Sequence, residues 1–189
     1  MMEGCSGIAR LIETRRRFVI STHLNPEGDA LGSQLALGRA LETLGKDVRL
    51  CNRDPVPGLY RFLPGADRIE VVEMVPAPYD LLVLVDCGSL DRTGLRLPEP
   101  GGGEMVIVDH HLSSQGTGPW HWIDAGASAT GEMIYALIRE LAVPLDKTIA
   151  VNLYAAITTD TGTFRYSNTT PHVLRMAAGG RPPGQGSLT

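Results

Sequence analysis

The chain has 189 residues, 43% of them hydrophobic, which fits one globular domain, or one domain and a small part of another, with a sizeable apolar core. Its formal net charge of -4 at pH 7 argues against binding to long nucleic-acid duplexes, because that binding depends on neutralising many phosphates, but it leaves a small or short anionic ligand open. The sequence lacks both the run of ~18 apolar residues that a membrane span needs and the apolar run of a signal peptide, so we expect no membrane partner and a cytoplasmic location.

Five short apolar runs are predicted to form β-strands. They cover residues 17–23, 47–52, 68–72, 81–86 and 105–110. Because these runs are continuously apolar, both faces of each strand should be covered, as in a parallel sheet. The predicted fold class is therefore α/β, with a mostly parallel sheet flanked by helices.

Three helices are predicted between and after these strands. Residues 29–45 carry a leucine stripe with the spacing i, i+4, i+7, and Gly45 can end this helix in a left-handed conformation. The first two strands and this helix would form a βαβ unit. Residues 128–142 and 146–162 each present one apolar face, so the second half of the chain is predicted to be mainly helical.

Polar residues stand directly after three of the predicted strands. His23 follows the first of them, Asp86 the fourth, and Asp109, His110 and His111 the fifth. Ligands of open α/β sheets bind beyond the carboxyl ends of the strands, so these side chains should share one site if the strands are neighbours. Carboxylates so close together could not all stay ionised without cations. Mixed histidine and carboxylate ligands favour manganese, iron, cobalt or zinc over calcium.

Several of these residues also have a purely structural explanation. Asp86 taken alone would most often be a turn or N-cap residue, Asp29 could cap the helix that follows it, and His23 could be a hydrogen-bonded histidine at a strand end. The pair His110 and His111 is harder to explain in this way. Adjacent strand side chains point to opposite faces, and one imidazole would be wasted in a core.

Four motifs, taken in order, resemble those of the DHH phosphoesterases. They are "HLNPEGDA" at residues 23–30, Asp86, "DHH" at residues 109–111, and Asp160 in "TTDTGTFRYSNTT". The phrases "YRFLPGA" and "TGTFRYSNT" are similar to those of the branch that contains oligoribonucleases (nano-RNases) and pAp phosphatases. The resemblance covers residues 8–178, a single catalytic domain, and the Gly- and Pro-rich residues 179–189 are predicted to form a flexible C-terminal tail.

The resemblance implies a site for two divalent cations, usually Mn²⁺, with Mg²⁺, Co²⁺ or Zn²⁺ as alternatives. The implied ligands are His23 and Glu27 for the first metal, Asp29, His110 and Asp160 for the second, and Asp86 for both. His111 would face the scissile phosphate. Asp109 would accept a histidine N–H and so fix the orientation of that ring.

The same resemblance implies a substrate and a reaction. A short single-stranded RNA would be cut to nucleoside 5′-monophosphates, or pAp would lose its 3′-phosphate to give AMP, by a two-metal mechanism. An acidic chain can accept such substrates because the cations supply local positive charge. We assign phosphate or sugar contacts to Arg165 and Asn168, with simple loop hydrogen bonding as the alternative. The oligomeric state is left open, with a homodimer among the alternatives.

The sequence departs from the family pattern in two places. Glu27 stands where the opening motif normally has Asp, so the first metal is expected to sit differently or to bind less tightly. The chain also ends at Thr189, and we expect the second, substrate-holding domain of DHHA1 type to be absent. Two alternative functions are kept: a manganese-dependent inorganic pyrophosphatase, which would use the same metal cluster, and a truncated metal- or nucleotide-binding domain without useful turnover, which the expected absence of the second domain favours.

Overall fold

A computed structural model describes residues 4–114 and 120–178 of the chain. Its helices are α1 (Cys5–Thr14), α2 (Gly28–Thr43), α3 (Thr130–Glu140), α4 (Lys147–Asp160) and α5 (Pro171–Ala177). Its strands are β1 (Arg17–Ser21), β2 (Asp47–Asn52), β3 (Glu70–Val71), β4 (Leu81–Val85), β5 (Glu104–Asp109) and β6 (Trp120–Ile123), and its short 3-10 helices are η1 (Gly58–Tyr60), η2 (Ala66–Arg68) and η3 (Leu90–Thr93). The tail predicted for residues 179–189 lies outside the described residues.

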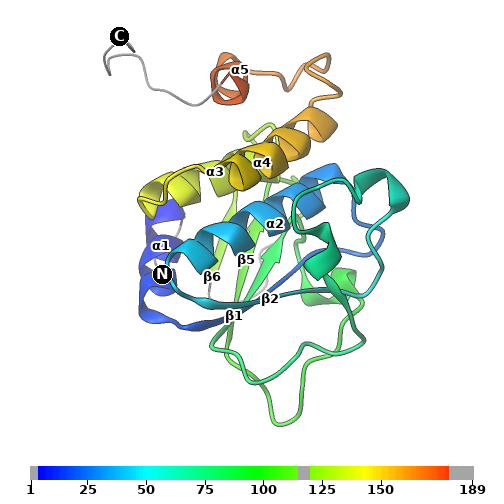
Figure 1. Ribbon diagram of the computed structural model, residues 1–189, viewed down its shortest axis with the longest axis vertical. Coiled ribbons are helices and arrows are strands. Elements are labelled where there is room, and N and C mark those ends of the chain that lie inside the picture. The colour runs from blue at the N-terminus through cyan, green and yellow to red at the C-terminus, as the bar shows by residue number, and fades with distance from the viewer. Residues whose placement is uncertain (1–3, 115–119, 179–189) are drawn as a thin grey trace.

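The strands form a six-stranded sheet in the order β3-β2-β1-β4-β5-β6, in which every pair of neighbours is parallel. This arrangement confirms the predicted α/β class with a parallel sheet. In the register of the central strands, Ile20 pairs with Val83, which pairs on its other side with Val106. The carboxyl ends of the central strands β1, β4 and β5 therefore lie side by side at one end of the sheet (Figure 1).

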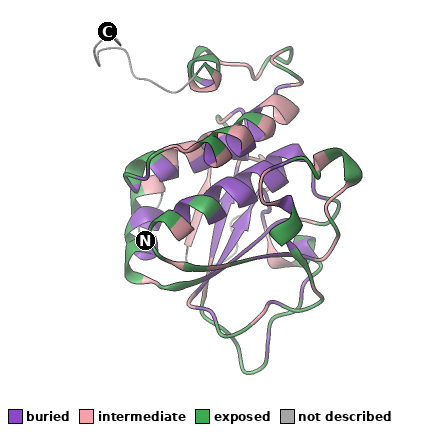
Figure 2. Cartoon of the chain, in the orientation of Figure 1, coloured by how far each residue is buried: buried purple, intermediate pink, exposed green. Residues whose placement is uncertain are grey.

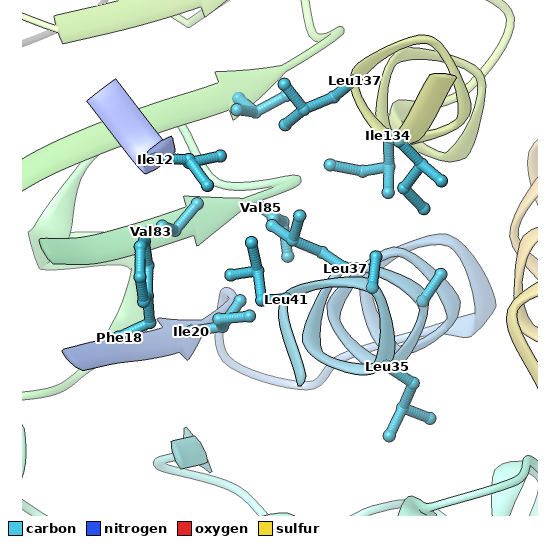
Figure 3. Packing of buried hydrophobic residues seen from close by; sticks show 14 of the residues in the cluster. Ile12, Phe18, Ile20, Leu35, Leu37, Leu41, Val83, Val85, Ile134 and Leu137 are labelled. Carbon is cyan, nitrogen blue, oxygen red and sulfur yellow. The ribbon is translucent and has the colours of Figure 1, made fainter. Parts of the chain in front are cut away.

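Helices α1, α2 and α3 cover one face of this sheet, and α4 packs on α2 and α3 (Figure 1). Ile20, Val83 and Val85 point from the strands into the main hydrophobic cluster, where they meet side chains such as Leu37 of α2 and Ile134 of α3 (Figure 3). Figure 2 shows that the central strands and much of α2 are buried. Each leucine-sized side chain removed from water in this way stabilises the fold by about 1.5–3 kcal/mol.

Loops cover the opposite face. Leu82 and Leu84 of β4 pack there against Val75, Tyr79 and Leu95, which come from segments before and after that strand. Among the described residues, no member of helices α1 to α5 contributes to this second cluster. Because successive strand side chains alternate between faces, coverage of both faces explains why β4 reads as an unbroken apolar run.

The close approach of α4 to α2 positions one side of the candidate site. A Cβ atom at Gly32 would lie 2.4 Å from the backbone oxygen of Asn152, and one at Gly28 would lie 2.0 Å from Thr159 Oγ1. Larger residues at these two positions of α2 would push the helices apart. The glycines therefore allow the carboxyl end of α4 to reach the amino end of α2, as Figure 1 shows.

The helices α1 and α5, the strand β6 and the three 3-10 helices were not predicted from the sequence. Strand β6 reads "WHWI" and is half-buried throughout, because it forms the edge of the sheet, so it lacks the apolar run that marks the central strands. The predicted helix at residues 29–45 ends at Thr43, and Gly45 follows in a left-handed conformation with φ 73°. In the described part of the chain, no helix is long and apolar enough to cross a membrane.

Candidate metal centre

The candidate site lies beyond the carboxyl ends of the central strands β1, β4 and β5. His23 comes two residues after β1, Asp86 comes directly after β4, and Asp109 at the end of β5 is followed by His110 and His111. The N–H of Asp86 donates to a carbonyl of β5 at 2.9 Å, and its φ of 54° lies in the left-handed region. A residue other than glycine costs of order 1–3 kcal/mol in such a conformation, and these positions cluster at functional sites.

Nitrogen and carboxylate atoms of this region form three groups in which all ligand atoms lie within 4.8 Å of one another. The groups are His23, Glu27 and Asp86; Asp29, His110 and Asp160; and Asp86, His110 and His111. Asp86 and His110 each belong to two groups. The structure thus brings together all six side chains that the family resemblance implies as metal ligands.

The two oxygens of Asp86 face different histidines. Asp86 Oδ2 lies 3.5 Å from His23 Nε2, whereas Oδ1 lies 3.7 Å from His110 Nε2 and 3.5 Å from His111 Nδ1. Oδ2 is buried and has no hydrogen-bond partner in the described part of the protein. Buried polar atoms nearly always have a partner, so this oxygen fits a bound cation.

The backbone orients the two histidines that would ligate metal. His23 Nδ1 lies 2.6 Å from the carbonyl oxygen of Leu24, and His110 Nδ1 lies 3.3 Å from that of Ala127. An Nδ1–H that donates to a carbonyl leaves Nε2 as the ligating atom, which is a common arrangement around metals. His110 Nε2 lies 3.0 Å from Asp160 Oδ2 but forms no well-aligned hydrogen bond. The donor set therefore fits divalent transition metals.

Asp29 is buried and accepts three hydrogen bonds. The donors are the backbone N–H groups of Thr130 at 2.6 Å and Gly131 at 2.8 Å, and the hydroxyl of Ser33 at 3.1 Å. Asp29 therefore caps α3 and not its own helix, whose N-cap is Glu27. Burial, and then the charges of neighbouring carboxylates, raise the pKa of Asp29 well above its usual value. Nearby cations would reverse this shift.

His111, a member of the third group of ligand atoms, forms a hydrogen-bonded pair with Asp109. His111 Nδ1 lies 2.8 Å from Asp109 Oδ1, and Ser114 Oγ donates to Asp109 Oδ2. The hydrogen bond that His111 Nδ1–H donates to Asp109 raises the pKa of His111. Burial alone would raise the pKa of Asp109, but the hydrogen bonds from His111 and Ser114 outweigh burial and lower it. A charged Asp109 therefore holds the His111 ring in one tautomer and orientation.

Three polar residues of the site were missed in the sequence. Ser33 and Ser114 donate to Asp29 and Asp109, and the Thr130 hydroxyl donates to Asp86 Oδ1 at 2.9 Å. Thr130 stands 44 residues from Asp86, so no spacing rule could have indicated this contact. A hydroxyl residue at the start of a predicted helix was the one local signal, and it normally indicates an ordinary cap.

Arg165 and Asn168, assigned to substrate contacts, form loop hydrogen bonds in the structure. Arg165 Nε donates to the carbonyl of Gly162 at 2.9 Å, and Arg165 is exposed. Asn168 Nδ2 donates to the carbonyls of Ser128 at 3.0 Å and Asp160 at 3.1 Å. Asn168 therefore connects the end of α4 to the segment that precedes α3.

Comparison with known proteins gives a consistent set of similarities. Residues 17–157 match the family model described as the N-terminal domain of the DHH family. The chain is 41% identical over 160 residues to the bifunctional oligoribonuclease and PAP phosphatase NrnA of Thermus thermophilus, a match that covers 84% of this chain and 48% of that protein. The chain spans about half the length of the curated relatives that it matches.

Two solved structures show the same fold at low sequence identity. An exopolyphosphatase-related protein from Bacteroides fragilis superposes with a TM-score of 0.78 at 22% identity, covering 90% of this chain and 54% of that one. The exonuclease RecJ bound to manganese superposes with a TM-score of 0.52 at 17% identity, covering 94% of this chain and 48% of that one. At these identities the likeness concerns the fold alone.

Proposed function

The chain belongs to the DHH family, and from that membership we propose that it is a metal-dependent phosphoesterase. The proposed reaction is hydrolysis of short single-stranded oligoribonucleotides to nucleoside 5′-monophosphates, of pAp to AMP, or of both, by a two-metal mechanism. The printed name of the Thermus thermophilus relative, an oligoribonuclease and PAP phosphatase, supports this choice of substrates.

The observation that carries the proposal is the position of Asp86 in two groups of ligand atoms. His23, Glu27 and Asp86 would hold a first cation, and Asp29, His110 and Asp160 would hold a second, with Asp86 shared between them. Two divalent cations, when bound, neutralise charge on the attacking and leaving oxygens of a phosphoryl group. Manganese is our first choice, supported by the manganese named for the RecJ structure, with Mg²⁺, Co²⁺ or Zn²⁺ as alternatives.

His111 is the proposed catalytic residue of the protein itself. His111 Nδ1–H donates to Asp109, so Nε2 of the same ring is left to contact a phosphate oxygen. The hydrogen bond to Asp109 raises the pKa of His111, and a proton carried at Nε2 would be donated to that oxygen as negative charge develops. Asp109 acts through His111 and is therefore a positioning residue in this scheme.

The remaining assignments are also proposals. Arg165 and Asn168 are the groups that we assign to phosphate or sugar contacts, because both follow the ligand Asp160 in the chain. We further infer a catalytic domain at residues 8–178 and a cytoplasmic location, with a homodimer as one assembly to test by light scattering. Long duplexes are not expected as substrates, given the net charge of -4.

Steady-state assays with Mn²⁺ on pApA, pAp and pyrophosphate test the proposed function. We expect hydrolysis of pApA or pAp that depends on added metal and is lost in Asp86→Asn, which keeps the size of the side chain but removes its charge. Asp80→Asn, far from the donor groups in the same protein, is the matched control and should retain activity. Turnover of pyrophosphate alone would favour the pyrophosphatase alternative, and bound metal without any hydrolysis would favour a binding domain.

A further inference from the structure

The amino end of α3 contacts two of the proposed metal ligands at once. Thr130, the first residue of α3, donates its backbone N–H to Asp29 Oδ2 at 2.6 Å and its hydroxyl to Asp86 Oδ1 at 2.9 Å. The next residue, Gly131, donates its N–H to Asp29 Oδ1 at 2.8 Å. Thr130 has an exposed fraction of 0%, so water does not compete for these contacts. One buried residue therefore joins carboxylates from both donor groups.

The hydroxyl of Thr130 selects one orientation of the Asp86 carboxylate. Asp86 Oδ2 faces His23 of the first group, whereas Oδ1 faces His110 of the second. Rotation about the Cβ–Cγ bond would move both oxygens away from these directions. Among the described residues, Thr130 donates the hydrogen bond that Asp86 Oδ1 accepts and Oδ2 has no hydrogen-bond partner, so the hydroxyl favours this rotation.

This contact leaves Asp86 free to ligate two cations. A carboxylate oxygen has two lone pairs, so Oδ1 can accept the Thr130 hydroxyl and still face a metal. Gly131 completes the arrangement, because a Cβ there would lie 2.6 Å from the Cβ of Ala156 and would push α3 away from α4.

We propose that Thr130 is a positioning residue of the metal centre, whose hydroxyl holds Asp86 in the orientation that two cations can share. The inference rests on the proposed metal-dependent function, because it assigns to Thr130 an effect on cation affinity. Residues that orient metal ligands by hydrogen bonds typically change metal affinity by about 10- to 100-fold when they are replaced. The backbone N–H of residue 130 is retained in any substitution except proline, so the test isolates the hydroxyl.

Calorimetric titration with MnCl₂ alone, on the wild type, Thr130→Ser, Thr130→Val and Thr130→Ala, tests the proposal. Serine keeps the hydroxyl and loses the methyl group, and we expect its affinity to stay within about threefold of the wild type. Valine keeps the shape and loses the hydroxyl, and alanine loses both, so each should bind Mn²⁺ roughly 10- to 100-fold more weakly. Should the valine variant fail to fold, the serine and alanine variants make the same comparison.

A matched control separates this role from a general loss of stability. Thr93 is another buried threonine, whose hydroxyl donates to Leu90 O at 2.7 Å and accepts from Leu95 N at 3.0 Å, outside the donor groups. Thr93→Val should lower the melting temperature of the metal-free protein and leave Mn²⁺ affinity unchanged.

Three results would overturn the proposal. The first is a folded Thr130→Val protein that binds Mn²⁺ as tightly as the wild type. The second is a serine variant as weak as the alanine variant, which would assign the effect to the methyl group. The third is a wild type that binds none of Mn²⁺, Mg²⁺, Co²⁺ and Zn²⁺ in the same titration, and this result alone would also overturn the proposed function.

Discussion

At the residue scale, the side chain of Asp86 is buried, with one oxygen hydrogen-bonded to Thr130 and the other without a hydrogen-bond partner among the described residues. An uncompensated buried carboxylate costs several kcal/mol, because the charge loses its hydration. The positive φ of Asp86 adds a backbone strain of order 1–3 kcal/mol. Metal binding would compensate both the desolvation cost and the backbone strain of Asp86. This compensation explains why the fold retains a buried aspartate at this position.

Substitution of Asp86 should remove more metal than substitution of any other proposed ligand. Asp86→Ala deprives both donor groups of a ligand and removes the negative charge that would lie between two cations. Asp160→Ala, which affects one group only, is the comparison. Elemental analysis of the purified variants counts the ions, and an Asp86→Ala protein that still holds two manganese ions would contradict the prediction.

Glu27 offers a second test at this scale, because the family pattern has aspartate there. Glu27 is exposed at the N-cap position of α2, and its carboxylate lies within 4.8 Å of the ligand atoms of His23 and Asp86. Glu27→Asp removes one rotatable bond that metal binding must order, so Mn²⁺ affinity should rise about 2- to 5-fold. Titration beside Glu27→Gln, which should bind more weakly, measures this effect. Weaker binding by the aspartate variant would mean that the loop is adapted to glutamate.

At the element scale, the site depends on how closely helices α2, α3 and α4 approach one another. Gly32 faces the backbone of α4, and Gly131 faces Ala156 of the same helix. The helices therefore contact one another at glycine positions. This close contact lets the proposed metal ligands at the helix ends come within a few ångströms of one another. Hydrophobic periodicity shows which side of a helix is buried, but it does not show how near the neighbouring backbone lies.

Gly32→Ala should separate α2 from α4 and weaken the metal centre. The added methyl would lie 2.4 Å from the backbone oxygen of Asn152, and overpacking of this kind destabilises by about 1–3 kcal/mol, more than the better helix propensity of alanine returns. Gly38→Ala is the matched control in the same helix, because the three atoms nearest to its methyl belong to the side chain of Leu50 and not to a backbone. Urea unfolding and Mn²⁺ titration of both variants test the prediction, and equal effects would refute it.

At the scale of the whole molecule, the sheet and most candidate ligands could be predicted because their signals are local. Five consecutive apolar residues indicate strand β4, and Asp86 and His110 follow such runs in the sequence. The edge strand β6 is half-buried and carries no comparable run. The role of Thr130 depends on a contact across 44 residues, which only the assembled fold creates.

At the amino-terminal ends of β1 and β4, the pair Arg17 and Asp80 makes the free energy of unfolding depend on pH. Asp80 accepts hydrogen bonds from Arg17 Nη2 at 2.6 Å and from the Arg17 backbone N–H at 2.9 Å, and these bonds lower its pKa to about 2. The folded pKa lies below the unfolded value of about 3.9, so the stabilisation is complete above that value and disappears as the pH falls through 2.

Asp80→Asn should therefore be less stable than the wild type at pH 6, and the difference should shrink between pH 4 and pH 2. Urea unfolding in the presence of a chelator, repeated across this pH range, measures the difference in the free energy of unfolding between the two proteins. The other carboxylates titrate in both proteins, so their contributions cancel in this difference. A difference that stays constant down to pH 2 would show that Asp80 contributes nothing through its charge.

The six proposed ligands are spread over the sequence from His23 to Asp160, on loops and helix ends that only the native chain gathers. An unfolded chain keeps no more than local pairs, such as His23 with Glu27 or His110 with His111. Cations should therefore bind the native state almost exclusively and act as reversible cross-links between its first and last thirds. By mass action, Mn²⁺ at 100 times its dissociation constant would add about 2.7 kcal/mol to the free energy of unfolding, so the heat resistance of this protein would follow the free manganese around it.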